Sequence, residues 1–280
     1  MYYSKKKLTK KRLTRGKILI PFIIILGLIY MPLKITKPKE IYSSSSISKY
    51  ELTNKLKEES KSDSKVQYIL NNIDKYPTEL LELLSRNIET VDFVYGYPKH
   101  SDKRIFNKIS IKKYYTPGEI PLFLQWDKKW GYDFYGNKPI AINGCAPTSL
   151  AMVAVGLTGN TSINPLVVSD YAYENGYYVD GVGSSWSLIS EGAKHFGLNS
   201  QELPLSKSSI LSTLKEGYPI IVTVSPGTFT STGHFLVLTG VTDDGKVTIN
   251  DPNSKINSSK SWDVDVFLKE TKNLWKMSKL

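Results

Sequence analysis

The chain has 280 residues, enough for one domain of typical size plus an appendage, and its 40% hydrophobic and 11% aromatic content is typical of a globular protein. A formal net charge of +11 suggests a nucleic-acid partner, but residues 1–17 hold eight basic and no acidic side chains. The rest of the chain has 29 basic against 26 acidic residues, a net of +3. The basicity therefore belongs to an N-terminal tail, and we expect no nucleic-acid binding.

The residues after this tail predict a membrane anchor. Ile18–Leu33 is 16 residues without a charge, short for a span of roughly 20, and Ile35 with snorkelling lysines extends it. We interpret 1–17 as a cytoplasmic tail and 18–35 as a signal anchor that spans the cell membrane once. The Lys/Arg excess before the span places the rest on the extracytoplasmic side. A cleaved signal peptide, without an evident A-x-A-like site, and a buried core helix are the alternatives.

Cys145 is the only cysteine. An exported chain with one cysteine forms no internal disulfide, and an oxidisable thiol outside the cell is a liability that catalytic chemistry would justify. The alternative is a small, buried, inert side chain.

Composition then divides the remainder of the chain. Residues 36–65 are rich in Ser, Lys and Glu and predict a solvated linker. Residues 66–118 have apolar positions at helical spacing and predict two or three short helices docked on the main domain. The main domain is expected over 119–280.

The pattern of the main domain predicts an α+β fold, with helices first and an antiparallel sheet after them. "CAPTSLAMVAVGL" predicts a helix buried on every side and ended by Gly156 or Gly159. Residues 184–197 predict an amphipathic helix, and 206–217 another helix. "YPIIVTVS" predicts a central strand, and 233–251 a hairpin with an Asp244-Gly245 turn. The apolar stripe of the amphipathic helix is expected to contain Trp186, Ile189, Ala193 and Phe196.

Cys145 begins the predicted buried helix, where free backbone N–H groups and the helix dipole favour a thiolate. Pro147 suits a first helical turn. Gly144 permits close approach of a substrate backbone. A thiol nucleophile also needs an imidazole, a group that orients this imidazole, and donors for an oxyanion.

Of the three histidines, His234 is the candidate base, because it opens an apolar strand after a glycine and has no packing reason to be there. A hydrogen-bonded structural histidine is the alternative. His100 is expected to be exposed in the helical segment, and His195 to suit the end of a helix.

Asp251, 17 positions after His234, is the candidate orienting residue, with Asn253 in reserve and a purely turn-forming aspartate as the alternative. A strict two-residue loop at Asp244-Gly245 sets Asp251 opposite Leu238, four residues from His234. The pair therefore needs a wider loop, a bulge or other strand pairing.

The stretches "NGCAPTSLAM", "GHFLVLTGV" and "INDP" together resemble papain-like cysteine peptidases related to the bacteriocin-processing, double-glycine type. "LQWDKKWGY" and "GSSWSLISEGAKHFGL" are similar to the extracytoplasmic, membrane-anchored branch of that family in Gram-positive bacteria. The resemblance covers residues 120–260 and implies a papain-like fold, with Cys145 on a helix and His234 and Asp251 on the sheet.

The resemblance further implies that Cys145 is the nucleophile, His234 the base and acid, Asp251 the orienting residue and Gln125 the second oxyanion donor. In transporter-linked relatives that glutamine stands closer to the cysteine, so Asn143 is a substitute. Ala146 stands where the family usually has glycine.

The expected function is cleavage of a peptide or cell-wall peptide amide through a thioester, with no cofactor or metal. A wall amidase, a transpeptidase and a non-catalytic surface binding domain are the alternatives. The aromatic residues after Gln125 either wall a cleft or form core: Trp126, Trp130, Tyr132 and Tyr135.

Overall fold

The structure is a computed structural model that describes residues 49–100 and 109–280. The predicted cytoplasmic tail and the predicted membrane span lie outside the described residues. In the part of the chain that is described, none of the helices combines the length and apolar character needed to cross a membrane.

Four short helices form the N-terminal part of the described chain, which we call the helical segment (residues 49–100). Their apolar faces converge on one cluster that includes Leu52, Leu81 and Phe93. Three 3-10 turns lie between or after them: η1 (Ile73–Lys75), η2 (Ile88–Thr90) and η3 (Tyr97–Lys99). The helices are α1 (Lys49–Ser60), α2 (Ser64–Asn71), α3 (Thr78–Arg86) and α4 (Val91–Gly96).

Helix α1 corrects the predicted linker over 36–65, because its residues are helical from Lys49 onward. Leu52 and Leu56 are fully buried, and α1 contacts α2 and α3. Two leucines four positions apart share one helix face, so a segment of polar composition still docks through a narrow apolar stripe.

The helical segment packs against residues of the main domain. Its apolar cluster continues into Trp126, Tyr132 and Ala141 of the main domain, and Tyr132 Oη donates to the Phe93 carbonyl at 2.8 Å.

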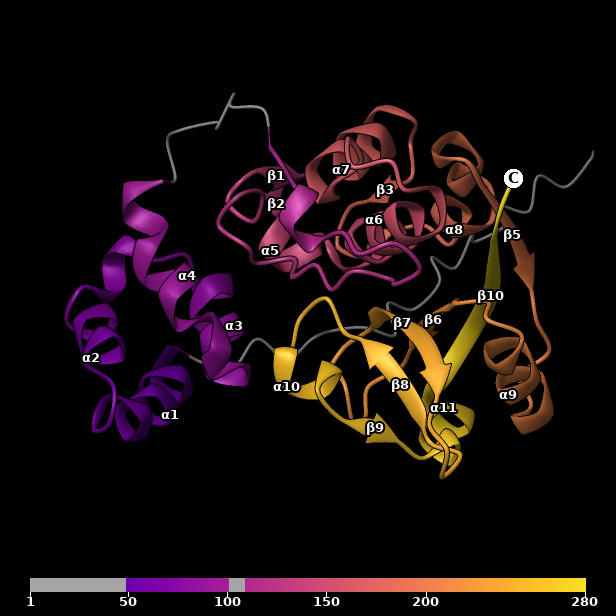
Figure 1. Ribbon diagram of the computed structural model, residues 1–280. Coiled ribbons are helices and arrows are strands. Elements are labelled where there is room, and N and C mark those ends of the chain that lie inside the picture. Colours follow the sequence, from indigo (N-terminus) through magenta and orange to yellow (C-terminus); the bar gives the residue numbers. More distant parts are fainter. Residues whose placement is uncertain (1–48, 101–108) are drawn as a thin grey trace, which may run out of the picture. The chain divides into compact units, whose positions relative to one another are not determined.

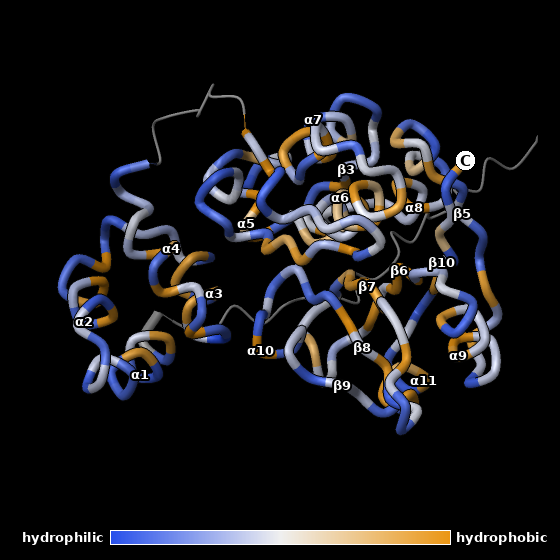
Figure 2. Tube along the Cα trace, in the orientation of Figure 1, coloured by the Kyte–Doolittle hydropathy of each residue, from blue (hydrophilic) through white to orange (hydrophobic). Residues whose placement is uncertain are grey.

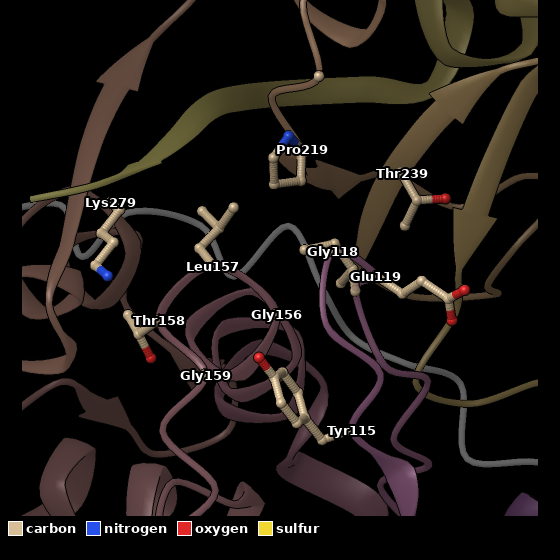
Figure 3. Close-up of a pocket in the computed structure, with 12 residues that line it drawn as sticks. Tyr115, Gly118, Glu119, Gly156, Leu157, Thr158, Gly159, Pro219, Thr239 and Lys279 are labelled. Carbon is tan, nitrogen blue, oxygen red and sulfur yellow. The ribbon is translucent and has the colours of Figure 1, made fainter.

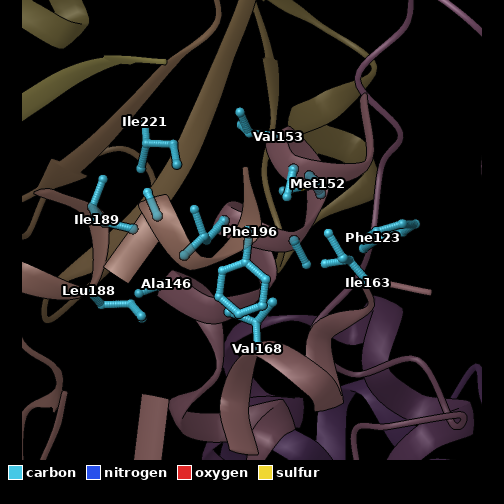
Figure 4. Close-up of a cluster of buried hydrophobic side chains, with 14 of the residues drawn as sticks. Phe123, Ala146, Met152, Val153, Ile163, Val168, Leu188, Ile189, Phe196 and Ile221 are labelled. Atoms are coloured by element: carbon cyan, nitrogen blue, oxygen red, sulfur yellow. The ribbon is translucent and has the colours of Figure 1, made fainter. Parts of the chain in front are cut away.

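Helix α6 (Cys145–Thr158) lies at the centre of the main core, where it is surrounded by the apolar side chains shown in Figure 4. Every residue from Ala146 to Val155 is buried, so the helix is apolar all round, as predicted. Gly159 ends it with a left-handed φ of 72°. The neighbouring elements are η4 (Lys112–Tyr114), β1 (Phe134–Tyr135), β2 (Lys138–Pro139), α5 (Ile140–Asn143), α7 (Pro165–Glu174), β3 (Tyr178–Val179) and β4 (Gly183–Ser184).

The amphipathic helix predicted over 184–197 is instead a single helical turn, α8 (Ser187–Ser190), followed by the 3-10 helix η5 (Gly192–Phe196). Ile189, Ala193 and Phe196 are buried as predicted, but Trp186 is 47% exposed. Gly192 stands in the middle of the pattern, and glycine is the weakest helix former after proline, so the helix does not continue through it.

Six strands form one antiparallel sheet in the order β5-β10-β6-β7-β8-β9, which confirms the α+β class (Figure 1). Strand β6 is internal and fully buried, and β6 and β7 are hydrophobic along most of their length (Figure 2). The strands are β5 (Leu198–Glu202), β6 (Ile220–Val224), β7 (His234–Val241), β8 (Val247–Asn250), β9 (Ser261–Trp262) and β10 (Thr271–Lys279).

Both faces of this sheet are covered. Phe235 and Val237 of β7 pack in the core around α6, whereas Leu236 and Leu238 pack in a second core. Alternation along the strand thus sends successive side chains to opposite cores. The second core also receives apolar residues from α9 (Lys207–Lys215) and α11 (Val264–Glu270), and α10 (Lys255–Ser258) follows β8.

The β7–β8 hairpin resolves the predicted register conflict. Its turn is wider than two residues, since Thr242 N–H donates to the Lys246 carbonyl at 2.8 Å and Gly245 takes a φ of 80°. A bulge then shifts the register between Leu238 and Gly240, so Asn250 pairs with Val237. Asp251 therefore stands level with Leu236, two residues rather than four from His234.

Candidate active site

Cys145 is the first residue of α6 and is partly buried. Gly144 precedes it with a φ of −89°, and a Cβ there would come within 2.5 Å of both Ile140 Cγ2 and the Ile140 carbonyl oxygen. The glycine therefore gives room to the preceding turn α5. The approach of a substrate backbone at Gly144 stays a prediction.

His234 and Asp251 form a buried pair, with His234 Nε2 2.7 Å from Asp251 Oδ1. His234 is 7% exposed and Asp251 is fully buried. An ionised carboxylate only accepts hydrogen bonds, so Nε2 carries the proton of this bond. The other ring nitrogen, Nδ1, is then the one left for Cys145, whose side chain is near enough to raise the pKa of His234.

Electrostatics favour the charged form of both members of the pair. Burial alone would lower the pKa of His234, but the Asp251 carboxylate and Cys145 together raise it from 6.5 to about 10. Burial would raise the pKa of Asp251, yet the charge and hydrogen bond of His234 and a further bond from Asn257 lower it. A protonated imidazole beside a cysteine is the pairing on which thiol nucleophiles depend.

The loop after β8 holds Asp251 in place. Asn253 N–H donates to Asp251 Oδ1 and Asn257 Nδ2 donates to Oδ2, each at 2.8 Å, while Asp251 N–H donates to Ser258 Oγ at 2.9 Å. Asp251 therefore accepts the hydrogen bonds that shape the turn and also contacts His234. Its turn-forming role and its proposed orienting role are compatible. The side chain of the reserve candidate, Asn253, has its Oδ1 buried without a partner among the described residues. Asn257 and Ser258 were not predicted as partners of Asp251, and the Asn/Ser-rich composition of the loop is their only signal.

Gln125 lies between the two halves of this arrangement. Its backbone N–H donates to the Pro252 carbonyl, next to Asp251, and its Nε2 donates to the Ala141 carbonyl, four residues before Cys145, both at 2.7 Å. Gln125 is thus held between the residue after Asp251 and the turn α5 that precedes Cys145. The alternative, Asn143, donates its Nδ2 to the Tyr135 carbonyl at 3.2 Å.

Tyr135 is a buried residue near Cys145 and is paired with Ser184. Tyr135 Oη lies 2.8 Å from Ser184 Oγ. Burial raises the pKa of Tyr135 to about 12, a rise that the Ser184 bond opposes and the nearby Cys145 increases. The sequence named Tyr135 only among the aromatic residues and gave no signal for Ser184.

The Peptidase_C39 like family model matches residues 118–279, more than half of the chain. The chain belongs to the Peptidase_C39 like family. It is accordingly a cysteine-type peptidase, and the family predicted from the sequence is confirmed. Among solved structures, the chain is similar to the peptidase domain of Streptococcus ComA, a bi-functional ABC transporter involved in a quorum-sensing pathway. That similarity has 21% identity and a TM-score of 0.37 over 49% of this chain and 93% of the other. No curated protein sequence matches the chain.

In this C39-like peptidase the two remaining histidines lie away from Cys145 in packing contacts of their own. His100 is half-buried rather than exposed, with Nδ1 2.8 Å from the Gly96 carbonyl oxygen and its ring stacked on Tyr132. His195 is exposed and stacks on Tyr171 with ring centroids 4.1 Å apart.

The aromatic residues after Gln125 are core rather than cleft wall. Trp130 and Tyr135 are fully buried around α6, and Trp126 and Tyr132 pack against the helical segment. Ala146 is likewise fully buried, so the methyl group that replaces the family's usual glycine faces the core.

A separate hollow of about 770 Å³ lies at the other end of α6 (Figure 3). Residues 156–159 line it together with Tyr115, Glu119, Pro219 and Lys279. The lining begins at Gly156, eleven residues after Cys145 along α6 and about 16 Å away at the rise of an α-helix, so the hollow is distinct from the candidate site. Within the described ranges, no three metal-ligating side chains gather into a cluster.

Proposed function

We propose that the protein hydrolyses a peptide amide with Cys145 as nucleophile, His234 as base and acid, and Asp251 as the residue that orients His234. The 2.7 Å contact between His234 Nε2 and Asp251 Oδ1 carries this proposal, because it leaves Nδ1 for the thiol.

The reaction follows from these positions. With the Cys145 proton already held on His234 Nδ1, the thiolate attacks the substrate carbonyl carbon to form a tetrahedral oxyanion. The imidazolium then protonates the amine, the C–N bond breaks, and a thioester remains on Cys145. Water, deprotonated by His234, attacks the thioester and releases the acid and the thiol.

Two donors are proposed for the oxyanion. The backbone N–H of Cys145 lies in the first turn of α6, where N–H groups have no partner within the helix. The second is Gln125 Nε2, which uses one of its two N–H bonds on the Ala141 carbonyl. Its fixed position between Ala141 and Pro252 supports this role, because an oxyanion donor works best when it is held before the reaction begins.

Cys145 is expected to react much faster than a small model thiol with iodoacetamide at pH 6. A free thiol is only roughly 0.3% thiolate at that pH, whereas a thiolate paired with imidazolium needs no further deprotonation. The second-order rate constant should exceed that of the model thiol by ten-fold or more, on the order of what this difference allows. Since the chain has one cysteine, mass spectrometry of the alkylated protein assigns the reaction.

The matched control is the same protein unfolded in urea, which should react like the model thiol. Equal rates for the folded protein and the model thiol would contradict the nucleophile assignment. Analysis of products from peptide and cell-wall substrates then separates hydrolysis from transfer to an amine.

We also propose that residues 18–35 anchor the protein in the cell membrane, with the peptidase domain on the extracytoplasmic side. The uncharged run Ile18–Leu33 after eight basic residues supports this orientation. In cells that express the full chain, the protein should sediment with membranes, and protease added to intact spheroplasts should remove the domain. Recovery in the soluble fraction, or protection until lysis, would contradict the anchor or its orientation.

A further inference from the structure

A turn of the helical segment is hydrogen-bonded to the loop that follows Asp251. Glu89 lies in η2, and its Oε1 accepts a hydrogen bond from Ser254 Oγ at 2.6 Å. Its Oε2 accepts from Lys255 N–H at 2.9 Å, and Oε1 lies 3.4 Å from the backbone nitrogen of Ile256. One carboxylate thus binds three successive residues of a loop about 165 positions away in the sequence.

The same turn makes a second contact with this loop. Asn87 Nδ2 donates to the Asn253 carbonyl, which also accepts from Trp126 Nε1 at 2.9 Å. Asn87 Oδ1 in turn accepts from Glu89 N–H at 3.0 Å, so the two side chains are held in one arrangement. Residues 253–256 are therefore tied to the helical segment by side chains that are themselves fixed.

The loop held in this way supplies the partners of Asp251. Asn253 N–H and Asn257 Nδ2 donate to its two carboxylate oxygens, and Ser258 Oγ accepts its backbone N–H. Ser254 Oγ, the atom bound by Glu89, also accepts from Asn257 N–H at 3.1 Å. A continuous set of hydrogen bonds therefore runs from Glu89 through Ser254 and Asn257 to Asp251.

We propose that Glu89 is a positioning residue for the catalytic pair, and that the helical segment braces the Asp251 loop rather than serving as a spacer. Glu89 touches none of the reacting atoms and acts through the loop. The inference rests on the proposed roles of His234 and Asp251. Glu89 lies outside residues 118–279, so the brace is supplied from beyond the part of the chain that matches the family model.

A purely structural role for Glu89 would lower stability without changing the chemistry of His234. A positioning role predicts more, because a displaced Asp251 supports the imidazolium less well. Asp251 and Cys145 are the titratable groups that raise the pKa of His234. A weaker interaction with Asp251 therefore lowers the pKa of His234. The imidazolium would then be lost at a lower pH.

The test is the alkylation rate of Cys145 by iodoacetate as a function of pH, in the full chain. The negative reagent is attracted by the imidazolium, so its rate falls as His234 loses the proton. In Glu89→Gln the decrease of the alkylation rate at alkaline pH should occur about one pH unit lower than in the parent protein. An adjacent opposite charge shifts a pKa by roughly 1 to 3 units. Ser254→Ala removes the same contact from the loop side and should shift the profile in the same direction.

Glu82→Gln is the matched control, because Glu82 pairs with Arg86 of the same helix at 3.6 Å. Its profile should coincide with that of the parent protein. If the Glu89→Gln and Ser254→Ala profiles also coincide with it while the parent reacts rapidly, the brace is refuted and the proposed function stands. A parent profile like that of a free thiol would refute the ion pair and the brace together. If Glu89→Gln is unfolded by circular dichroism, Ser254→Ala decides.

Discussion

Replacing His234 by alanine is expected to reduce kcat/KM for peptide cleavage by roughly 10²–10⁴-fold, the usual contribution of a positioned acid–base group. His234 is the histidine that contacts both Cys145 and Asp251, so its removal leaves the thiol without a proton acceptor and the amine without a donor. The measurement is the cleavage rate of a peptide that the parent protein hydrolyses, at matched protein concentration.

His195→Ala is the matched control, because this imidazole is exposed and stacks on Tyr171. Its activity should equal that of the parent. In His234→Ala, Asp251 keeps its bonds from Asn253 and Asn257, so we expect a stability loss of about 1–3 kcal/mol and a folded domain. Full turnover by folded His234→Ala would exclude His234 as the base and acid.

The local parts of this site were readable from the sequence because they depend on short-range patterns. An uninterrupted apolar run predicts a buried helix, so the place of Cys145 at the start of α6 followed directly. A β-branched run followed by a hairpin predicts antiparallel strands, which placed His234 at a strand start. The distance between His234 and Asp251 depended on the bulge and the wider turn, and neither leaves a clear mark on the residue types.

The remaining features depend on contacts between distant segments. Leu52 and Leu56 are two apolar residues in a polar stretch, and only their packing on α2 and α3 makes that stretch a helix of the fold. Trp186 fits the apolar stripe by spacing, but the break at Gly192 removes the helix on which the spacing relies. Glu89 carries no sequence signal, since its partners lie about 165 residues away.

The second large effect is expected at Asp251. Asp251→Ala removes the acceptor for His234 Nε2–H and should lower kcat/KM by about 10²-fold, the scale on which misplacement of a catalytic group acts. Asp251→Asn keeps an oxygen acceptor and should retain more activity than the alanine variant. The two variants together separate the orientation of the imidazole from the charge of the carboxylate.

The charge has its own signature in the pH profile of Asp251→Asn. Asp251 and Cys145 raise the pKa of His234 from 6.5 to about 10, against the effect of burial. Removing the negative charge lowers that pKa, so the imidazolium needed to protonate the leaving amine is lost at a lower pH. The alkaline limb of kcat/KM should therefore move toward neutral pH, whereas Asp244→Asn, in the exposed turn of the same hairpin, should leave it in place. An Asp251→Asn profile that overlays the parent would mean that the carboxylate charge does not set the protonation of His234.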